Sequence, residues 1–123
     1  MIYNIDTREQ FDIFIPQKEL FDDSMSDILA SQVEKARENG RSLILQFEFV
    51  KTMNPEIVAN IVEMHETMYQ DNLSFVICCL SPELKTIFHQ NEFADQLNIC
   101  PTLIEAIDIV SMEGLERELL GGE

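Results

Sequence analysis

Histidine and cysteine are the side chains of this sequence best suited to catalysis or metal binding, and both are scarce. His65 and His89 are the only histidines, and they fall on separate predicted helices without the spacing of a metal site. His65 lies within the apolar arc of its helix, which favours a buried, hydrogen-bonded structural histidine over a catalytic base. His89 ends its helix, where a positive charge suits the helix dipole.

The three cysteines also favour a structural role. Cys78 and Cys79 are adjacent in a predicted buried strand, so we expect their side chains to point to opposite faces and not to hold one ion together. Cys100 stands at a predicted strand end beside Pro101; we expect partial exposure there, and its reactivity stays open. An odd number of cysteines, two of them adjacent, predicts no disulfide framework and fits the reducing cytoplasm.

The motifs of common enzyme and cofactor sites are missing from the sequence. No GxGxxG, P-loop, nucleophile elbow or CxxC occurs, and the chain has only four glycines. Carboxylates are plentiful, but an acid pair needs a cleft that a sequence cannot reveal. We therefore predict a protein that is not an enzyme, with no catalytic residues, no metal and no cofactor.

Composition narrows the class of partner. The 123 residues carry a formal charge of −15, and a field of that sign repels phosphates, so nucleic acid and anionic membranes are excluded as main partners. No apolar run has the length of a membrane span, and the N-terminus does not resemble a signal sequence. With 46% hydrophobic residues the chain is expected to fold, and its length of 123 residues fits one domain.

Strands and helices alternate along the chain. Period-2 patterns and apolar runs predict strands at 1–6, 11–16, 41–50, 73–80 and 98–100, and helical patterns predict helices at 24–39, 54–70, 81–89 and from 102 onward. The order ββαβαβαβα predicts an α/β domain with a mostly parallel sheet and an N-terminal antiparallel hairpin.

Local signals set the expected ends of these helices. Ser24 with Asp27 forms a start signal, Ser81 is a cap, and Thr102 with Glu105 forms a capping box. We expect Gly114 to weaken or bend the last helix. The predicted division is a domain over 1–110 and a C-terminal helical tail over 111–123 that continues the last helix.

The helix predicted at 54–70 separates polar and apolar side chains most clearly. Asn54 is its expected cap and Pro55 its first residue. At 100° per residue the apolar residues share one arc. The opposite arc holds Glu56, Asn60, Glu63 and Thr67. On local grounds alone these residues indicate only an ordinary helix start, with the Glu56 carboxylate near the positive end of the helix dipole.

Several segments together resemble the STAS domain family, which is named for sulphate transporters and anti-sigma-factor antagonists. The buried run 43–47 matches the strand that precedes the family signature, and Asn54–Ile57 fills the signature itself. Ser81–Leu84 resembles the start of the family's third helix, and Cys100–Ala106 the start of its last. The likeness covers about residues 1–110 and is strongest over 43–107.

The signature departs from the family pattern, which usually reads Asp-Ser-Ser-Gly or Asp-Ser-Thr-Gly. Asn54 replaces the aspartate, Pro55 and Glu56 replace the two hydroxyl residues, and Ile57 replaces the glycine. The resemblance implies that the family's phosphorylatable switch serine lies at the position of Glu56. It therefore implies a STAS-like fold and a non-catalytic protein-binding domain without that switch.

Three functional hypotheses follow. The leading one is a bacterial signalling module in transcription regulation, whose partner, by analogy a serine-kinase-type anti-sigma factor, binds a strip made of Asn54, Pro55, Glu56, Asn60, Glu63 and Thr67. The second is a structural subunit that assembles with itself, for example as a homodimer, or with other STAS-like chains, through Met112, Leu115, Leu119 and Leu120. The third is an enzyme or small-ligand carrier that uses Cys100 or an acidic cleft. The partner's identity and a modification of Thr52 stay open.

Overall fold

A five-stranded sheet forms the centre of the molecule. The structure is a computed structural model, and it describes residues 2–121. The strands lie in the order β1-β2-β4-β6-β7. β1 (Tyr3–Thr7) pairs antiparallel with β2 (Phe11–Pro16), and β4 (Ser42–Gln46), β6 (Phe75–Cys78) and β7 (Asn98–Cys100) continue the sheet in parallel. The predicted α/β class, with its mostly parallel sheet and opening hairpin, is confirmed.

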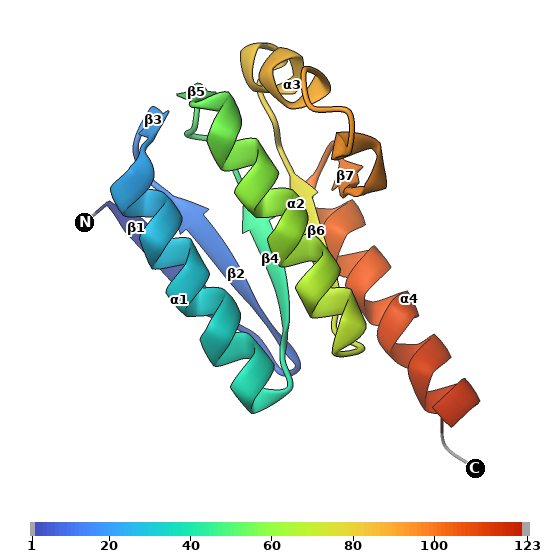
Figure 1. Cartoon of the computed structure of the whole chain (residues 1–123). Helices are drawn as coiled ribbons and strands as arrows, with labels where there is room; N and C mark the ends of the chain where they lie inside the picture. The colour runs from blue at the N-terminus through green and yellow to red at the C-terminus, as the bar shows by residue number, and fades with distance from the viewer. Residues whose placement is uncertain (1, 122–123) are drawn as a thin grey trace.

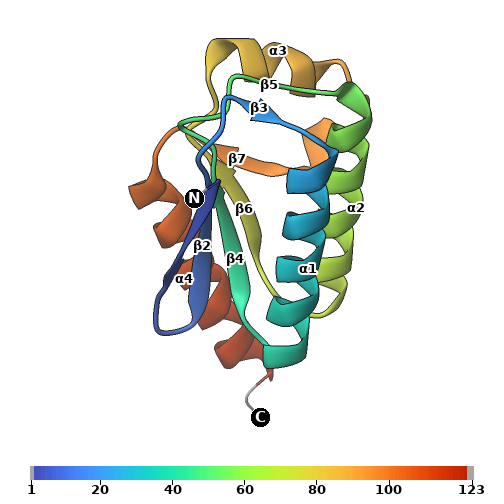
Figure 2. The same cartoon turned by 90° about the vertical axis from the view of Figure 1, so that its left-hand side faces the viewer.

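Helices cover both faces of this sheet (Figures 1 and 2). α1 (Asp23–Asn39) and α2 (Pro55–Gln70) lie side by side on one face, and α4 (Leu103–Gly121) lies on the other. α3 (Pro82–His89) and a short 3₁₀ turn (Ala94–Gln96) sit at the carboxyl end of the parallel strands. None of the helices formed by residues 2–121 combines the length and the apolarity of a membrane span.

The sheet separates two hydrophobic cores because successive strand residues point to opposite faces. In β4, Leu43 and Leu45 face α1 and α2, whereas Ile44 faces α4. The core under α1 and α2 is the larger and contains the buried rings of Phe14, Phe47 and Phe75. The smaller core under α4 includes Ile13, Val76, Cys78, Ala106 and Val110.

Three of the four predicted helix starts are confirmed, among them Thr102, whose Oγ1 accepts from the Glu105 N–H at 3.2 Å, and one is wrong. Asn54 Oδ1 accepts a hydrogen bond from the backbone N–H of Glu56 at 2.9 Å, and Ser81 Oγ accepts one from Leu84 at 3.1 Å. The cap of α1, however, is Asp22, whose Oδ1 accepts from the Met25 N–H at 3.0 Å, and the predicted start at Ser24 was two residues late. Both residues are good caps, so sequence alone did not separate them.

A two-stranded parallel ribbon was not predicted. It joins β3 (Leu20–Phe21) to β5 (Thr52–Met53) above the start of α1. The strand predicted over 41–50 ends at Gln46 because the chain then turns, with the Val50 N–H donating to the Phe47 carbonyl. The ribbon fixes the segment that leads into α2.

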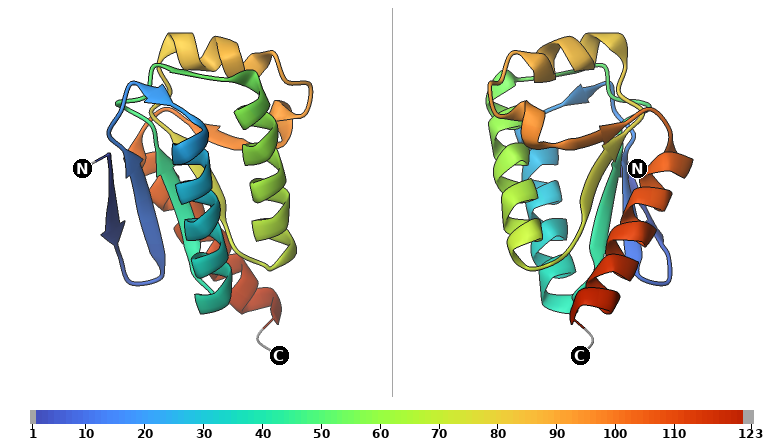
Figure 3. Two further views of the ribbon diagram at one scale, coloured as in Figure 1. Left: turned by 60° about the vertical axis from the view of Figure 1, so that its left-hand side comes forward. Right: turned by 90° about the vertical axis from the view of Figure 1, so that its right-hand side faces the viewer.

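α4 runs without interruption from Leu103 to Gly121. Gly114 does not interrupt it, and the expected weakening or bend at Gly114 stays a prediction. Its C-terminal turns extend past the ends of the strands, as both panels of Figure 3 show.

A polar network connects α4 to the last turn of α2. Glu113 accepts hydrogen bonds from the hydroxyls of Tyr69, at 2.7 Å, and of Ser74, at 2.6 Å. Asn98 donates to the Tyr69 oxygen at 2.6 Å, and Arg117 donates to Ser74 Oγ at 2.9 Å. Burial and Glu113 raise the pKa of Tyr69 to about 12. This network links the two helical layers through side chains at the start of β6 and β7.

Candidate functional site

The start of α2 forms an exposed corner of the molecule. Asn54, Pro55 and Glu56 are all exposed, and the corner lies beside β5 and near α3 (Figure 1). The Asn54 side chain caps the Glu56 N–H, and the Asn54 carbonyl accepts from the Ile57 N–H at 2.8 Å. Among residues 2–121 no ion pair involves the Glu56 carboxylate. The corner therefore offers a fixed negative charge to solvent.

The rest of the predicted strip follows the outer face of α2. Asn60 and Glu63 are exposed, and Thr67 is half-buried. The Thr67 hydroxyl donates to the Glu63 carbonyl at 2.9 Å. At a rise of about 1.5 Å per residue, Thr67 lies roughly 16 Å from Glu56 along the helix axis. The six predicted residues therefore form two groups, the corner and the more distant face.

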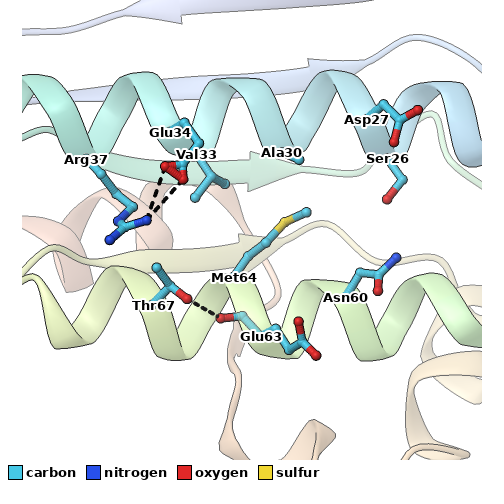
Figure 4. Close-up of a pocket in the computed structure, with 10 residues that line it drawn as sticks. All are labelled: Ser26, Asp27, Ala30, Val33, Glu34, Arg37, Asn60, Glu63, Met64 and Thr67. Carbon is cyan, nitrogen blue, oxygen red and sulfur yellow. Dashed lines mark hydrogen bonds and ion pairs between the residues drawn. The ribbon is translucent and has the colours of Figure 1, made fainter.

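The second group forms one wall of a groove between α1 and α2. The groove has a volume of about 330 Å³, and its α2 wall consists of Asn60, Glu63, Met64 and Thr67. Figure 4 shows these side chains facing Ala30, Val33 and Glu34 of α1, with the Met64 side chain between the helices. Sequence analysis missed the α1 wall, because no sequence signal tells which residues of two separate helices face one another.

The groove is acidic despite one arginine. Among the described residues that line it, Arg37 is the only cation. Its Nε lies 2.6 Å from an Asp71 oxygen and its guanidinium 3.0 Å from Glu34, and Asp71 is the main cause that raises the pKa of Arg37. Because Arg37 is already paired, Asp27 and Glu63 give the rim a net negative charge.

A second groove borders α2 on its other side. It has a volume of about 300 Å³ and lies between Ala59, Val62 and Glu66 of α2 and the segment containing Asn91 and Phe93. The Phe93 ring is 52% exposed. Sequence analysis did not single out Phe93 as a contact residue, although an aromatic side chain within a polar segment is a usable signal. The outer face of α2 is thus a polar ridge between two grooves.

His65 belongs to α2, but its ring takes part in packing and not in the polar ridge. The His65 ring packs against Tyr69, with ring centroids 4.6 Å apart, and against Phe75 at 6.1 Å. Neither ring nitrogen has a hydrogen-bond partner among residues 2–121, so the expected hydrogen-bonded histidine is wrong in that respect. Burial lowers the pKa of His65. A neutral, unpartnered ring of this kind serves packing.

The cysteines are arranged differently from the prediction. Cys79 lies just beyond β6 with φ at 66°, a left-handed conformation, and packs with Cys78 and Cys100 in the core under α4. The two neighbours therefore do not occupy opposite faces. Cys100 is buried, not partly exposed, and burial raises the pKa of both the Cys78 and the Cys100 thiols. Raised pKa values make these thiols poor nucleophiles.

Comparisons with known proteins add a family model and several solved structures. The model described as STAS domain matches residues 3–106. A comparison with curated protein sequences found no significant match.

The solved structures are similar in fold at low sequence identity. A proposed anti-sigma factor antagonist from Thermotoga maritima shares 15% identity over 89% of this chain and 94% of its own, with a TM-score of 0.77. The anti-sigma factor antagonist SpoIIAA of Bacillus, in its unphosphorylated form, shares 15% identity over 89% of this chain and 96% of its own, with a TM-score of 0.72. A chain of the stressosome, described as a signal integration and transduction hub, shares 12% identity over 93% of this chain and 99% of its own, with a TM-score of 0.60.

Proposed function

Since the chain belongs to the STAS domain family, we propose that it is a non-catalytic, protein-binding signalling module whose partner contacts the corner and the outer face of α2. One observation carries this proposal: Asn54, Pro55 and Glu56 are exposed and continue into an acidic groove. Relatives of the same fold that are described as anti-sigma factor antagonists support a role in protein binding.

The chemistry of the corner supports binding without a phosphorylation switch. We take Glu56 to stand at the position of the family's switch serine, as the sequence resemblance implies, and a glutamate carries one fixed charge where phosphoserine carries about −1.5 to −2. The Glu56 carboxylate cannot be added or removed by a kinase or a phosphatase. The partner's affinity is therefore set by the sequence and not by a covalent modification at this position.

The acidic charge beside the α2 ridge supports a partner that presents a basic surface. Asp27 and Glu63 are exposed acids that line the groove beside the ridge. A patch of lysine and arginine side chains on the partner complements them and accelerates association at low salt. A serine-kinase-type anti-sigma factor in the bacterial cytoplasm, or another STAS-like chain, is the proposed partner.

Affinity capture from a native lysate, with this domain as bait, tests the proposal. We expect recovery of an ATP-binding, kinase-like protein. Glu63→Lys reverses a charge at the groove and should abolish capture, whereas Glu9→Lys makes the same change in the distant β1–β2 turn and should not. Equal capture by both variants would exclude the α2 ridge as the contact surface.

Glu56→Ser tests the role of the corner separately. If the partner discriminates against a negative charge at this position, wild-type binding is weak and Glu56→Ser strengthens it. Titration of the captured partner against both proteins measures the difference. Unchanged affinity would remove Glu56 from the binding mechanism without affecting the groove.

The alternative function is a self-assembling STAS subunit with no role in sigma-factor control. It rests on the exposed apolar side chains of α4, which include Met112, Leu115, Leu119 and Leu120. Truncation after Val110 would also remove Glu113 and Arg117 from the network around Ser74, so a point variant such as Leu115→Ser is the cleaner test. A concentration-dependent oligomer that this variant abolishes, measured by sizing chromatography with light scattering, would favour the alternative.

A further inference from the structure

α4 is apolar on two opposite faces. Its inner face packs Ala106 and Val110 against the sheet. At 100° per residue, four apolar side chains fall within an arc of roughly 80° on the opposite side. This outer stripe consists of Ile104, Met112, Leu115 and Leu119, which are 74%, 64%, 57% and 74% exposed.

An apolar stripe on the outside of a surface helix indicates a missing contact. A surface helix that packs only on its own domain normally has one apolar face and one polar face. The described residues include ten large apolar side chains that are exposed, and half of them belong to α4. Such a concentration marks an interaction site more often than scattered exposed residues do.

The charges around the outer stripe are acidic. Glu105 and Glu116 lie along one side of it, Glu118 lies on the other side, and Asp108 lies within it; all four are exposed. Arg117 is the only basic residue of α4. Its guanidinium points inward, where it donates to Ser74 Oγ and lies 3.9 Å from Glu113. No cation of α4 is therefore available on the outer face.

These charges disfavour a second copy of this chain as the occupant. In an antiparallel pair of α4 helices centred between Ser111 and Met112, Ile104 would meet Leu119 of the other copy. The same register places the Asp108 carboxylate against Leu115 and brings Glu105 near Glu116 of the other copy, because residues on the same flank meet in an antiparallel pair. A buried carboxylate without a cation and a like-charged pair both oppose this association.

We propose that the outer face of α4 binds an amphipathic helix of another protein, whose apolar stripe is flanked by lysine or arginine side chains. Ile104, Met112, Leu115 and Leu119 contact the apolar side chains of that helix. Its cations pair with Glu105, Asp108 and Glu116. The site lies on the face of the sheet opposite α2, so it is separate from the proposed α2 ridge and can be occupied at the same time.

A pair of synthetic peptides tests this proposal. The first is a helical peptide of about 18 residues, roughly five turns, with leucines along one face and lysines on both flanks. The second has glutamate in place of every lysine. Fluorescence anisotropy at about 0.15 M salt, where long-range attraction is largely screened, measures binding to the full chain. We expect the lysine peptide to bind and the glutamate peptide not to bind.

Variants distinguish the outer stripe from general attraction to an acidic protein. The double variant Leu115→Ser, Leu119→Ser keeps the net charge. We expect it to lower the affinity for the lysine peptide at least about tenfold. Phe93→Ser removes an exposed apolar ring on the α2 side and should leave the affinity unchanged. Circular dichroism verifies that each variant is folded. Equal affinity of the wild type and the double variant would overturn the proposal.

Sedimentation of the free wild-type chain tests the competing occupant. We expect that the free chain forms no dimer through α4. A dimer that the double variant dissociates would show that a second copy covers the stripe, and would overturn the proposal. Either failure leaves the α2 ridge untouched, because capture by that surface is measured with variants of Glu56 and Glu63.

Discussion

The two helical layers cover the same sheet but present different chemistry to solvent. α2 buries one apolar face and exposes a polar ridge with Glu56 and Glu63, whereas α4 packs against the sheet with one apolar face and exposes a second. Since an apolar surface that finds no cover inside the domain is stabilised by cover from outside, the two layers are suited to different partners. The α2 ridge suits a charged, polar contact, and α4 suits an apolar helix with basic flanks.

The layers should also differ in their share of the core, and that difference gives the largest expected effect. Phe75→Ala removes a fully buried ring under α1 and α2 and should lower the free energy of unfolding by about 3–5 kcal/mol. Val110→Ala in the smaller core under α4 should cost about 1–2 kcal/mol. Urea denaturation measures both. A loss below about 2 kcal/mol for Phe75→Ala would contradict the place of its ring at the centre of the larger core.

The polar network between the layers gives the next largest effect. Glu113→Ala leaves the hydroxyls of Tyr69 and Ser74 without their shared acceptor, and we expect a loss of about 2–3 kcal/mol in unfolding free energy. Glu118→Ala, five residues further along α4 and exposed, is the control and should change the free energy of unfolding by less than about 0.5 kcal/mol. If the two variants are equally stable, the network does not hold α4 to α2.

His65 makes the stability of the α2 layer dependent on pH. Burial lowers the pKa of His65 in the folded chain below its usual value of about 6.5, although Glu113 and Glu66 act in the opposite direction. Protonation therefore favours the unfolded chain, and this contribution to stability falls as the pH drops below about 6.5. His65→Phe lacks it, so the variant should gain stability relative to the wild type between pH 7 and 5. If the free energies of unfolding of the wild type and the variant change in parallel between pH 7 and 5, the His65 ring is not held neutral by burial.

The smallest effect is expected on the outer face of α4. Leu119→Ser exchanges a side chain that is 74% exposed, so the free energy of unfolding should change by less than about 0.5 kcal/mol. Thermal denaturation of the isolated chain measures this. A clear destabilisation would mean that Leu119 already packs within the domain. The α4 layer would then need no contact from outside.

Periodicity and capping chemistry were sufficient to predict the α2 layer. The apolar residues of α2 recur at helical spacing, Asn54 and Pro55 mark its start, and its polar arc is the ridge that the structure exposes. The alternation of strands and helices predicted the sheet, because each buried strand has a run of apolar residues. These features depend on contacts between residues that are near in sequence.

The features that sequence analysis missed depend on contacts between distant residues. The groove needs the distance between α1 and α2, and the β3–β5 ribbon pairs Leu20 with Thr52 over only two residues per strand. Cys79 adopts a positive φ that cysteine rarely adopts, so a strand pattern could not place its side chain. His65 follows the apolar arc, but no local pattern shows whether a ring nitrogen finds a partner.

The contact between Glu113 and Tyr69 has a consequence for communication across the domain. Glu113 belongs to α4, and Tyr69 lies in the last turn of α2, one turn or less beyond the groove residue Thr67. A rearrangement of α4 that moves Glu113 away therefore removes a hydrogen bond from the last turn of α2, and a rearrangement of α2 that moves Tyr69 away removes the same bond from α4. The stabilities of the two helical layers are therefore linked through a single carboxylate.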